Sequence, residues 1–573
     1  MPNFFTDNED LLFHFDNLNI EESVAIIEDN YREVQEYPYA PTDYQDAIEN
    51  YRLILGIIGD IAANVVAPRA ADVDAEGSTL KDGKVTYAEG TREAFSQLAQ
   101  ADLMGFTLPR KYGGLNFPVT IYAMAVEMIS RADASLMNLF GLQDIGLTIY
   151  KYGSDEQRAE FLPKLANGEC TGAMVLTEPD AGSDLQAIML QAYQDDKGDW
   201  RLRGVKRFIT NGCGDILLVL ARSESGTKDA RGLSLFACYG DDSVKVRRIE
   251  NKLGIHGSPT CELQFNDTPA QLIGKRKFGL IKYVMNLMNG ARLGVSAQSL
   301  GISQAAYEEA LKYARDREQF GRRIYDIPVV SNMLIDMRVA LESNRSLLYS
   351  TARWVDLRER LEEQISRLKA EGKAANELNA RLKEATRITA LLTPITKYLL
   401  SESANRICYD SLQIHGGTGY MKEFDIERLA RDARITNIYE GTSQLQIVAA
   451  TGGVINDVLV TYFEKKEEYV YKGVLTKLAD HLKEIRQIFL ESLKYVIDKQ
   501  DKYFQDVAAK ELVELYSFIY TGYLLLDEAE IESRKVFIAN RYIVSALARA
   551  TSHADAIKNE HFSDLLHADE ILI

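Results

Sequence analysis

The sequence has little that would support a metal centre or a disulfide framework. Its five cysteines, at positions 170, 213, 238, 261 and 408, are scattered through 573 residues, and no two of them form a CxxC pair. Dispersed free cysteines are typical of a reducing compartment, and cysteine-based zinc or iron–sulfur sites need closely spaced thiols. We therefore expect a cytoplasmic protein and assign no metal ligands.

An excess of positive charge is also missing. The chain carries 66 Lys and Arg against 84 Asp and Glu, for a formal net charge of −18. Proteins that bind nucleic acid or anionic membranes gain affinity from Lys and Arg that neutralise phosphate. We expect neither as the main partner.

Long apolar runs and a targeting sequence are absent as well. No uninterrupted apolar run approaches the ~20 residues that span a bilayer. The N-terminus, MPNFFTDNEDLLF, is acidic and lacks the basic n-region of a signal peptide. We expect no membrane span and no leader sequence.

The length and the hydrophobic pattern predict several domains. A chain of 573 residues, 46% of them hydrophobic, is longer than one hydrophobic core usually serves. Aromatics and prolines interleaved near the start suggest a hairpin-like or extended arm. The five expected segments are an N-terminal arm (1–46), a helical domain (47–170), a middle β-barrel domain (171–275), a helical bundle domain (276–453) and a C-terminal helical extension (454–573).

Periodicity distinguishes the second segment from the third. Apolar spacings of three and four predict helices at 47–68, 92–103, 119–130, 135–150 and 156–166. Short stretches rich in β-branched residues predict strands at 171–176, 200–209, 216–221, 233–237, 244–249 and 261–265. Because no helices separate these strands, an antiparallel barrel or sandwich is favoured over a doubly wound sheet.

Two features mark the helical segments that follow. The charged run 356–385, with Gly372 inside it, predicts a solvated helical hairpin. Further on, an apolar stripe from Val474 to Val496 predicts the core of the C-terminal extension.

Residues 428–446 contain the first candidate for catalysis. Glu440 is followed by Gly441 and Thr442, a sequence suited to the start of a helix. A carboxylate in this position can be a positioned base, or it can simply be part of an exposed helix start.

The strand-rich segment contains groups suited to a flat heteroaromatic ligand. Residues 174–184 read MVLTEPDAGSD, which supplies hydroxyls and approachable backbone amides. In the KRFITNG stretch, Phe208 could stack on a flat ring, and Thr210 would lie on the same side of the strand.

Five stretches, TEPDAGSD, KRFITNG, DREQFG, QIHGGTGY and IYEGTSQ, stand in the order found in acyl-CoA dehydrogenases. The chain resembles this FAD-dependent family over about residues 47–448. The resemblance implies a mainly α fold with a helical domain, a central β-barrel and a four-helix bundle, and flavin between barrel and bundle. The arm and the C-terminal extension resemble a longer bacterial subclass.

The resemblance implies dehydrogenation of an acyl-CoA to a trans-2-enoyl-CoA, with FAD as hydride acceptor and electron-transfer flavoprotein as oxidant. Glu440 matches the catalytic base, which removes the α-proton. Its backbone amide and a flavin hydroxyl would bind the thioester oxygen. Desolvation by bound acyl-CoA should raise the pKa of Glu440. The alternative position of the base in this family is Ala291, which cannot accept a proton.

The flavin contacts implied by the resemblance form three groups. Those around the ring are Met174, Leu176, Thr177, Gly182, Ser183, Phe208 and Thr210. Those at the ring or adenosine portion are Thr442 and Gln444. Those at the pyrophosphate and adenine, across a subunit boundary, are Arg317, Phe320, Gln413, Gly416 and Gly417. Phe208 replaces the commoner tryptophan, so stacking is kept and an indole donor is lost. A shared site implies a homo-oligomer, and we expect a homodimer.

For the acyl-CoA, the matching residues are Ser183, Asn289, Arg292 and Tyr439. Asn289 replaces an acidic residue of many relatives. The other conspicuous acids and histidines are expected to be structural; they are Glu127, Glu178, Glu262, His256 and His415.

Three alternatives stay open at this point. An acyl-CoA oxidase would share the first half-reaction and pass electrons to O2. A non-enzymatic binding protein could use the same scaffold. A decarboxylating dehydrogenase would need a cation at the far end of the acyl pocket.

Overall fold

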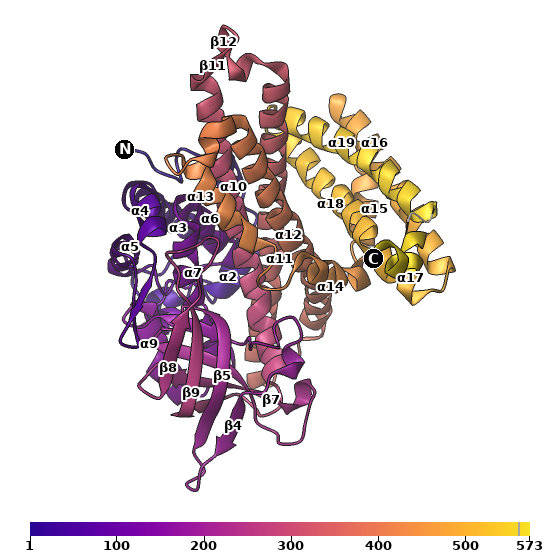
Figure 1. Ribbon diagram of the computed structural model, residues 1–573. Coiled ribbons are helices and arrows are strands. Elements are labelled where there is room, and N and C mark those ends of the chain that lie inside the picture. The colour runs from indigo at the N-terminus through magenta and orange to yellow at the C-terminus, as the bar shows by residue number, and fades with distance from the viewer. Residues whose placement is uncertain (560–561) are drawn as a thin grey trace. The chain divides into compact units, whose positions relative to one another are not determined.

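The computed structural model describes residues 1–559 and 562–573. The chain divides into two compact units, one formed by residues 1–316 with 404–440 and the other by residues 317–403 with 441–573. Figure 1 shows the elements of both units, coloured along the chain.

The first 45 residues are partly helical, so the expected extended or hairpin-like arm is wrong. They form α1 (Glu9–Asp16), α2 (Glu21–Ile27) and a short 3-10 turn. The side chain of Asn8 caps α1 by accepting from Leu11 N at 3.2 Å. The buried carboxylate of Glu28 accepts from Arg110 Nη1 at 2.6 Å, so this segment is bonded to the helical domain that follows it. Apolar residues such as Leu11, Phe15 and Val24 form the packed faces of these helices, whereas the interleaved stretch 37–41 lies outside them and Tyr39 is 62% exposed.

The helices predicted for residues 47–170 are present with one exception. The helices observed here are α3 (Tyr44–Ile61), α4 (Ala70–Glu76), α5 (Glu89–Gln100), α6 (Val119–Ala132), α7 (Ala134–Leu142), α8 (Ile145–Tyr152) and α9 (Asp155–Ala166), of which α4 was not predicted. The single helix predicted at 135–150 is wrong, because the chain breaks between α7 and α8. There Gln143 donates to Leu165 O at 2.8 Å and accepts from Gly172 N at 2.9 Å. A small hairpin, β1 (Thr79–Lys81) with β2 (Lys84–Thr86), was not predicted.

One stretch of this unit is more apolar than the sequence reading allowed. Among the described residues, the helical stretch 44–76 is long and apolar enough to cross a membrane by length and composition, and 44% of its most apolar window is buried. Its first helix, α3, packs against α6, so core packing accounts for its apolar residues.

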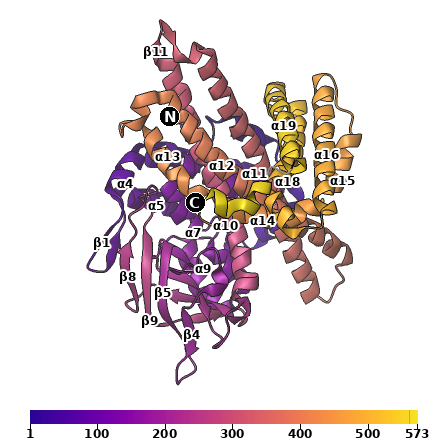
Figure 2. The same cartoon turned by 45° about the vertical axis from the view of Figure 1, so that its right-hand side comes forward.

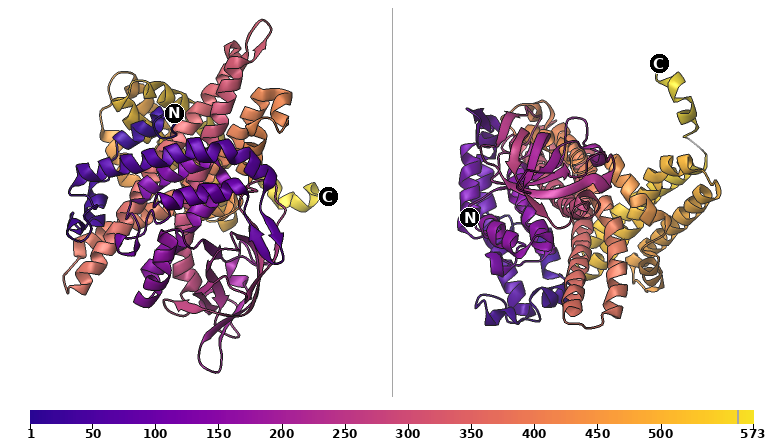
Figure 3. Two further views of the ribbon diagram at one scale, coloured as in Figure 1. Left: turned by 90° about the vertical axis from the view of Figure 1, so that its left-hand side faces the viewer. Right: turned by 90° about the horizontal axis from the view of Figure 1, so that it is seen from below.

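The middle domain is a mainly antiparallel sheet of eight strands. They are β3 (Gly172–Val175), β4 (Gln191–Gln194), β5 (Trp200–Thr210), β6 (Ile216–Arg222), β7 (Leu233–Tyr239), β8 (Val244–Ile249), β9 (Thr260–Pro269) and β10 (Gln271–Ile273). The order is β10-β7-β6-β4-β5-β9-β8, with β3 pairing parallel to β6. All six predicted strands are present, and β4 and β10 are additional. Figure 3 shows the sheet from two further sides.

Helix α10 (Met285–Asp316) lies against α6 and against α13 (Asp425–Thr436). The approach to α6 is close at Gly301, where a Cβ atom would meet Glu127 O at 2.3 Å. Glycine is required here to let the two backbones meet, and the contact fixes where the rest of α10 lies in this unit.

The second unit begins with the hairpin of β11 (Glu318–Gln319) and β12 (Arg322–Arg323). Helix α11 (Pro328–Ala370) and helix α12 (Asn376–His415), of which residues 404–415 belong to the first unit, form the predicted helical hairpin with its turn at Gly372. The start of the charged run is not solvated as predicted, because Asp356 and Glu359 are buried. The helices that follow are α14 (Ser443–Ile455), α15 (Val460–Glu468), α16 (Val474–Asp498), α17 (Lys502–Val507), α18 (Ala509–Ile531), α19 (Lys535–Lys558) and α20 (Ala568–Ile571).

The apolar stripe of α16 is buried as predicted, except for Val474 at its start, which is exposed. Helices α16, α18 and α19 lie side by side (Figure 2). Helix α18 packs on α11 and α14, and α19 packs on α11. The C-terminal extension is therefore a helical layer on the bundle helices of its own unit.

Candidate active site

Glu440 lies in a strained turn just after α13. Its φ is +56°, and that of Gly441 is +93°. A left-handed backbone is unfavourable for a residue with a Cβ atom and persists only where neighbouring contacts hold it. Thr442 then caps α14, with its side chain accepting from Leu445 N. The segment is thus a helix start, as its sequence suggested, and it also presents a half-buried carboxylate in an unusual conformation.

Helix α10 contacts this turn through Arg292. The guanidinium Nε donates to the carbonyl oxygen of Glu440 at 3.4 Å, and Nη1 donates to Asn289 Oδ1 at 3.1 Å. Burial lowers the pKa of Arg292, and the nearby charge of Glu440 opposes that shift. The structure therefore brings together three residues that the sequence associated with substrate and base: Asn289, Arg292 and Glu440.

Tyr439 turns its side chain toward α10 and α7. Its hydroxyl donates to Gln298 Oε1 and lies 3.4 Å from Asn138 Oδ1. Burial, and then the charge of Glu440, raise the pKa of the phenol well above its ordinary range, so it is neutral. Sequence reasoning predicted Tyr439 but missed Gln298 and Asn138, since a polar residue inside a helical pattern gives no signal of its partner.

Gly441 belongs to the second unit and is held by residues of that unit. Its carbonyl oxygen accepts from Lys397 Nζ at 2.8 Å and from Gln446 Nε2 at 3.0 Å. Lys397 is fully buried, although the sequence offered no reason to single it out. Of the predicted flavin contacts here, Thr442 is half-buried and Gln444 is exposed.

In the sheet domain, two contacts tie the loop after β3 to β5. Arg207 N donates to Thr177 O at 3.0 Å, and Lys206 Nζ donates to Leu176 O at 2.6 Å. Lys206 also lies 3.0 Å from Glu178 Oε1, and burial lowers its pKa to about 8 while Glu178 opposes the shift. Glu178 is structural, as expected, because it also accepts from Leu190 N. Lys206 was missed.

The groups that these contacts bring together suit a flavin ring. Phe208 is 50% exposed and has a φ of +60°. Thr177 and Thr210 are half-buried, and Gly182 and Ser183 are exposed. An exposed aromatic ring on β5, with hydroxyls and accessible amides on the same strand and on the loop bonded to it, suits the flat face and polar edge of an isoalloxazine, so these residues fit the cofactor that the sequence implied.

The residues predicted for pyrophosphate and adenine fall into both units. In the first unit Gln413, Gly416 and Gly417 are exposed at the end of α12, and a Cβ atom on either glycine would meet nothing within 4 Å. In the second unit Arg317 and Phe320 belong to the β11–β12 hairpin, where Phe320 is 92% exposed. An aromatic ring so exposed at a hairpin tip is available to another molecule.

The remaining acids and histidines make structural contacts. His415 stacks on Tyr313 at 4.4 Å, and burial lowers its pKa. His256 Nδ1 lies 2.8 Å from Asp74. Glu262 pairs with Arg247 at 3.0 Å, and Glu127 is buried in α6.

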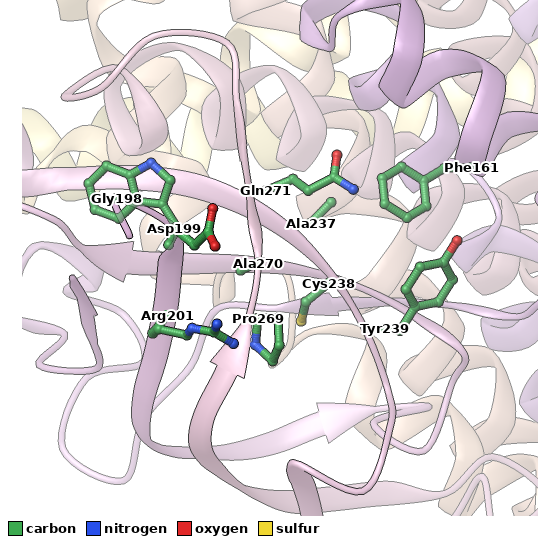
Figure 4. Close-up of a pocket in the computed structure, with 11 residues that line it drawn as sticks. Phe161, Gly198, Asp199, Arg201, Ala237, Cys238, Tyr239, Pro269, Ala270 and Gln271 are labelled. Atoms are coloured by element: carbon green, nitrogen blue, oxygen red, sulfur yellow. The ribbon is translucent and has the colours of Figure 1, made fainter. Parts of the chain in front are cut away.

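Two cavities in the first unit lie apart from this turn. One, of ≈ 360 Å³, is lined by residues of α9 and the sheet, including Phe161, Arg201 and Tyr239 (Figure 4). The other, of ≈ 380 Å³, lies beside α5. Within the described residues, no group of three or more His, Cys, Asp or Glu side chains could hold a metal ion.

Three family models match the chain. They describe the acyl-CoA dehydrogenase N-terminal domain (49–169), the middle domain (173–268) and the C-terminal domain (281–382 and 372–451). Together they match more than half of the 573 residues.

Individual relatives agree with these models. The 3-methylmercaptopropionyl-CoA dehydrogenase of Ruegeria pomeroyi is 31% identical over 489 residues, which cover 78% of this chain and 80% of that protein. The butyryl-CoA dehydrogenase structure from Megasphaera elsdenii has a TM-score of 0.60 at 30% identity and covers 71% of this chain and 98% of its own. An acyl-CoA dehydrogenase structure from Bacillus anthracis, complexed with FAD, has a TM-score of 0.74 and covers 89% of this chain and 88% of its own.

The similarity to the B. anthracis structure, at 23% identity, shows the fold alone. That structure covers more of this chain than the shorter M. elsdenii structure does. The predicted mainly α architecture with a central β domain and extra C-terminal helices is confirmed. The five sequence motifs, the three family models and the fold agree: the chain belongs to the acyl-CoA dehydrogenase family, whose members are FAD-dependent oxidoreductases.

Proposed function

We propose that this protein is an FAD-dependent acyl-CoA dehydrogenase that converts an acyl-CoA thioester to its trans-2-enoyl-CoA. The observation that carries the proposal is the turn at Glu440. Glu440 has a left-handed backbone, and Arg292 donates to its backbone carbonyl oxygen. A half-buried carboxylate held in such a strained conformation is what we expect of a positioned base. The chain's relatives include dehydrogenases named for acyl-CoA substrates.

In this reaction Glu440 removes the α-proton of the thioester, and its backbone amide donates to the thioester oxygen as negative charge develops there. Bound FAD would supply the acceptor for the hydride that leaves the β-carbon. Ser183, Asn289 and Arg292 contact the acyl-CoA, and Tyr439 flanks the base. The flat face and polar edge of the flavin are contacted by Phe208 and the other ring residues described above.

Membership of the family supports a wider setting as part of this proposal. Electron-transfer flavoprotein takes the electrons, the enzyme acts in fatty-acid β-oxidation in the cytoplasm, and two copies form a homodimer. The exposed Phe320 ring supports a cofactor site completed by a second copy. We retain the five-segment division at 46, 170, 275 and 453 as the domain organisation.

The decisive variant is Glu440→Gln, which keeps the shape and backbone amide but removes the base. Acyl-CoA should still bind and perturb the flavin spectrum, and anaerobic reduction of the flavin should slow by ~10²–10⁴-fold. Glu262→Gln is the control, because Glu262 pairs with arginines of the sheet domain. Glu178→Gln is unsuitable, since it would leave the buried Lys206 without its carboxylate partner. Normal flavin bleaching in Glu440→Gln would end the assignment of the base.

A panel of acyl-CoAs with an artificial electron acceptor would define the substrate. Rapid reoxidation of the reduced enzyme in air, without electron-transfer flavoprotein, would instead identify an acyl-CoA oxidase. Failure of every acyl-CoA to reduce the flavin would favour a binding protein on this scaffold.

A further inference from the structure

Tyr439 lies against two buried side-chain amides, and the function proposed above gives neither of them a role. Gln298, on α10, is fully buried, and Asn138, on α7, is 6% exposed. We call this pair the amide clamp. Ser258, in the loop between β8 and β9, is also fully buried and bonds Asn138, so three separate parts of the first unit meet at the amide clamp.

The hydrogen bonds of the amide clamp leave one arrangement open to it. Gln298 Nε2 donates to Ala134 O at 2.8 Å and to Asn138 Oδ1 at 3.3 Å. Asn138 Nδ2 donates to Ser258 Oγ at 3.4 Å. Because Nε2 is committed to these acceptors, Gln298 Oε1 is left to accept from the Tyr439 hydroxyl. Buried amides are unfavourable unless their atoms are bonded, so this set has little freedom to rearrange.

The clamp acts on the residue next to the base. Tyr439 and Glu440 share one peptide group, whose N–H is the donor assigned above to the thioester oxygen. The Glu440 backbone has a φ of +56°, which an unrestrained chain would relax. Arg292 bonds the backbone carbonyl on the C-terminal side of Glu440. The anchored phenol of Tyr439 restrains the chain on its N-terminal side.

We propose that Gln298 and Asn138 are positioning residues that set the Glu440 carboxylate and the Tyr439–Glu440 amide for catalysis by fixing Tyr439. The proposal rests on the function proposed above. It gives Tyr439 an anchoring role, with its hydroxyl bonded inside the protein. Small displacements of a reacting group are known to reduce rates by up to ~10²-fold.

The test replaces Gln298 with methionine, which has a similar volume and no amide. Gln298→Met should slow anaerobic flavin reduction at saturating acyl-CoA by about 10- to 100-fold. The affinity for an enoyl-CoA, measured by titration calorimetry, should change less than about threefold. Tyr439→Phe should have a similar effect, and the double variant should be no slower than either single variant. If Gln298→Met does not fold, Tyr439→Phe alone tests the same hydrogen bond.

The matched control is Gln304→Met, on the same helix. Gln304 is 3% exposed and donates to Glu308 Oε1, so the variant removes an equally buried amide that does not bond Tyr439. Its flavin reduction rate should equal that of the parent protein.

A second measurement needs neither turnover nor substrate. Hydrogen–deuterium exchange of the peptide covering 434–446 should speed up in Gln298→Met and in Tyr439→Phe and stay unchanged in Gln304→Met. Parental reduction rates in Gln298→Met, or equal losses in Gln304→Met, would overturn the proposal, as would unchanged exchange. If none of the acyl-CoAs reduces the flavin of the parent protein, the proposed function fails instead. The exchange data then still decide whether the amide clamp holds the turn.

Discussion

The ammonium of Lys535 lies 3.0 Å from the carboxylate of Glu342, and both side chains are wholly buried. Glu342 belongs to α11 and Lys535 opens α19. The same carboxylate accepts from Arg534 Nη1 at 2.6 Å. A cluster of buried charges thus joins the C-terminal extension to a bundle helix of its own unit.

Lys535→Met should therefore lower the free energy of unfolding substantially. The variant removes one charged hydrogen-bond partner from buried Glu342, which keeps Arg338 and Arg534, at a cost of about 1–3 kcal/mol. Urea unfolding measures the loss. The control is Arg541→Met, which breaks an exposed ion pair between the same two helices. Arg541 Nη2 lies 2.8 Å from Asp336 Oδ1, and the two side chains are 44% and 53% exposed. Its cost should be below about 1 kcal/mol, and equal losses in the two variants would refute the reading.

Phe208→Ala should weaken flavin binding. The ring is half exposed and carries the Arg207 guanidinium 4.6 Å from its centroid. Loss of stacking is worth about 1 kcal/mol beyond the buried area, which is seen as a higher dissociation constant for FAD. Phe208→Trp keeps an aromatic face and should bind at least as tightly. An unchanged FAD affinity in Phe208→Ala would mean that this ring does not face the flavin.

Asp432 should make the protein less stable as pH rises from about 4 to about 6. Burial raises its pKa from 3.8 to about 6, and the Arg428 charge opposes the shift. The folded state therefore binds this proton more tightly than the unfolded chain, and stability falls as the proton is lost. A shift of about two units corresponds to about 3 kcal/mol.

Asp432→Asn would remove this dependence while keeping an oxygen for Ile255 N, which lies 2.5 Å from Asp432 Oδ1. The difference in urea midpoint between variant and parent should favour the variant more at about pH 6.5 than at about pH 4.5. A difference that does not change with pH would show that Asp432 titrates normally.

In solution the protein should be a homodimer. Helices α18 and α19 pack on α11, and α18 packs on α14, so these faces of the second unit are already covered by its own chain. Light scattering should give twice the mass of one chain. A tetramer would show that covering these faces with the C-terminal extension does not prevent a larger assembly.

The sequence predicted regular elements well and buried polar contacts poorly. The six long or strongly apolar strands were recognised by their β-branched residues, whereas β4 and β10 are too short for a clear alternation. The N-terminal helices were missed because part of what stabilises them, the contact of Glu28 with Arg110, joins residues 82 positions apart.

The site shows the same contrast. Residue type and order in the motif around Glu440 suffice to propose this residue as the base. The left-handed backbone conformation of Glu440 could not be predicted from the motif. Gln298, Lys397 and Lys206 look like ordinary surface residues until the fold buries them.

The turn between α11 and α12 has a practical consequence. Gly372 has a φ of +70°, and a side chain added there would meet nothing within 4 Å. Its neighbours Glu371 and Lys373 are exposed, and doubling the length of such a loop costs only about 0.6 kcal/mol. A fluorescent label or an immobilisation tag inserted between these helices would therefore leave the residues around Glu440 intact, and the enzyme could be followed on a surface while it turns over.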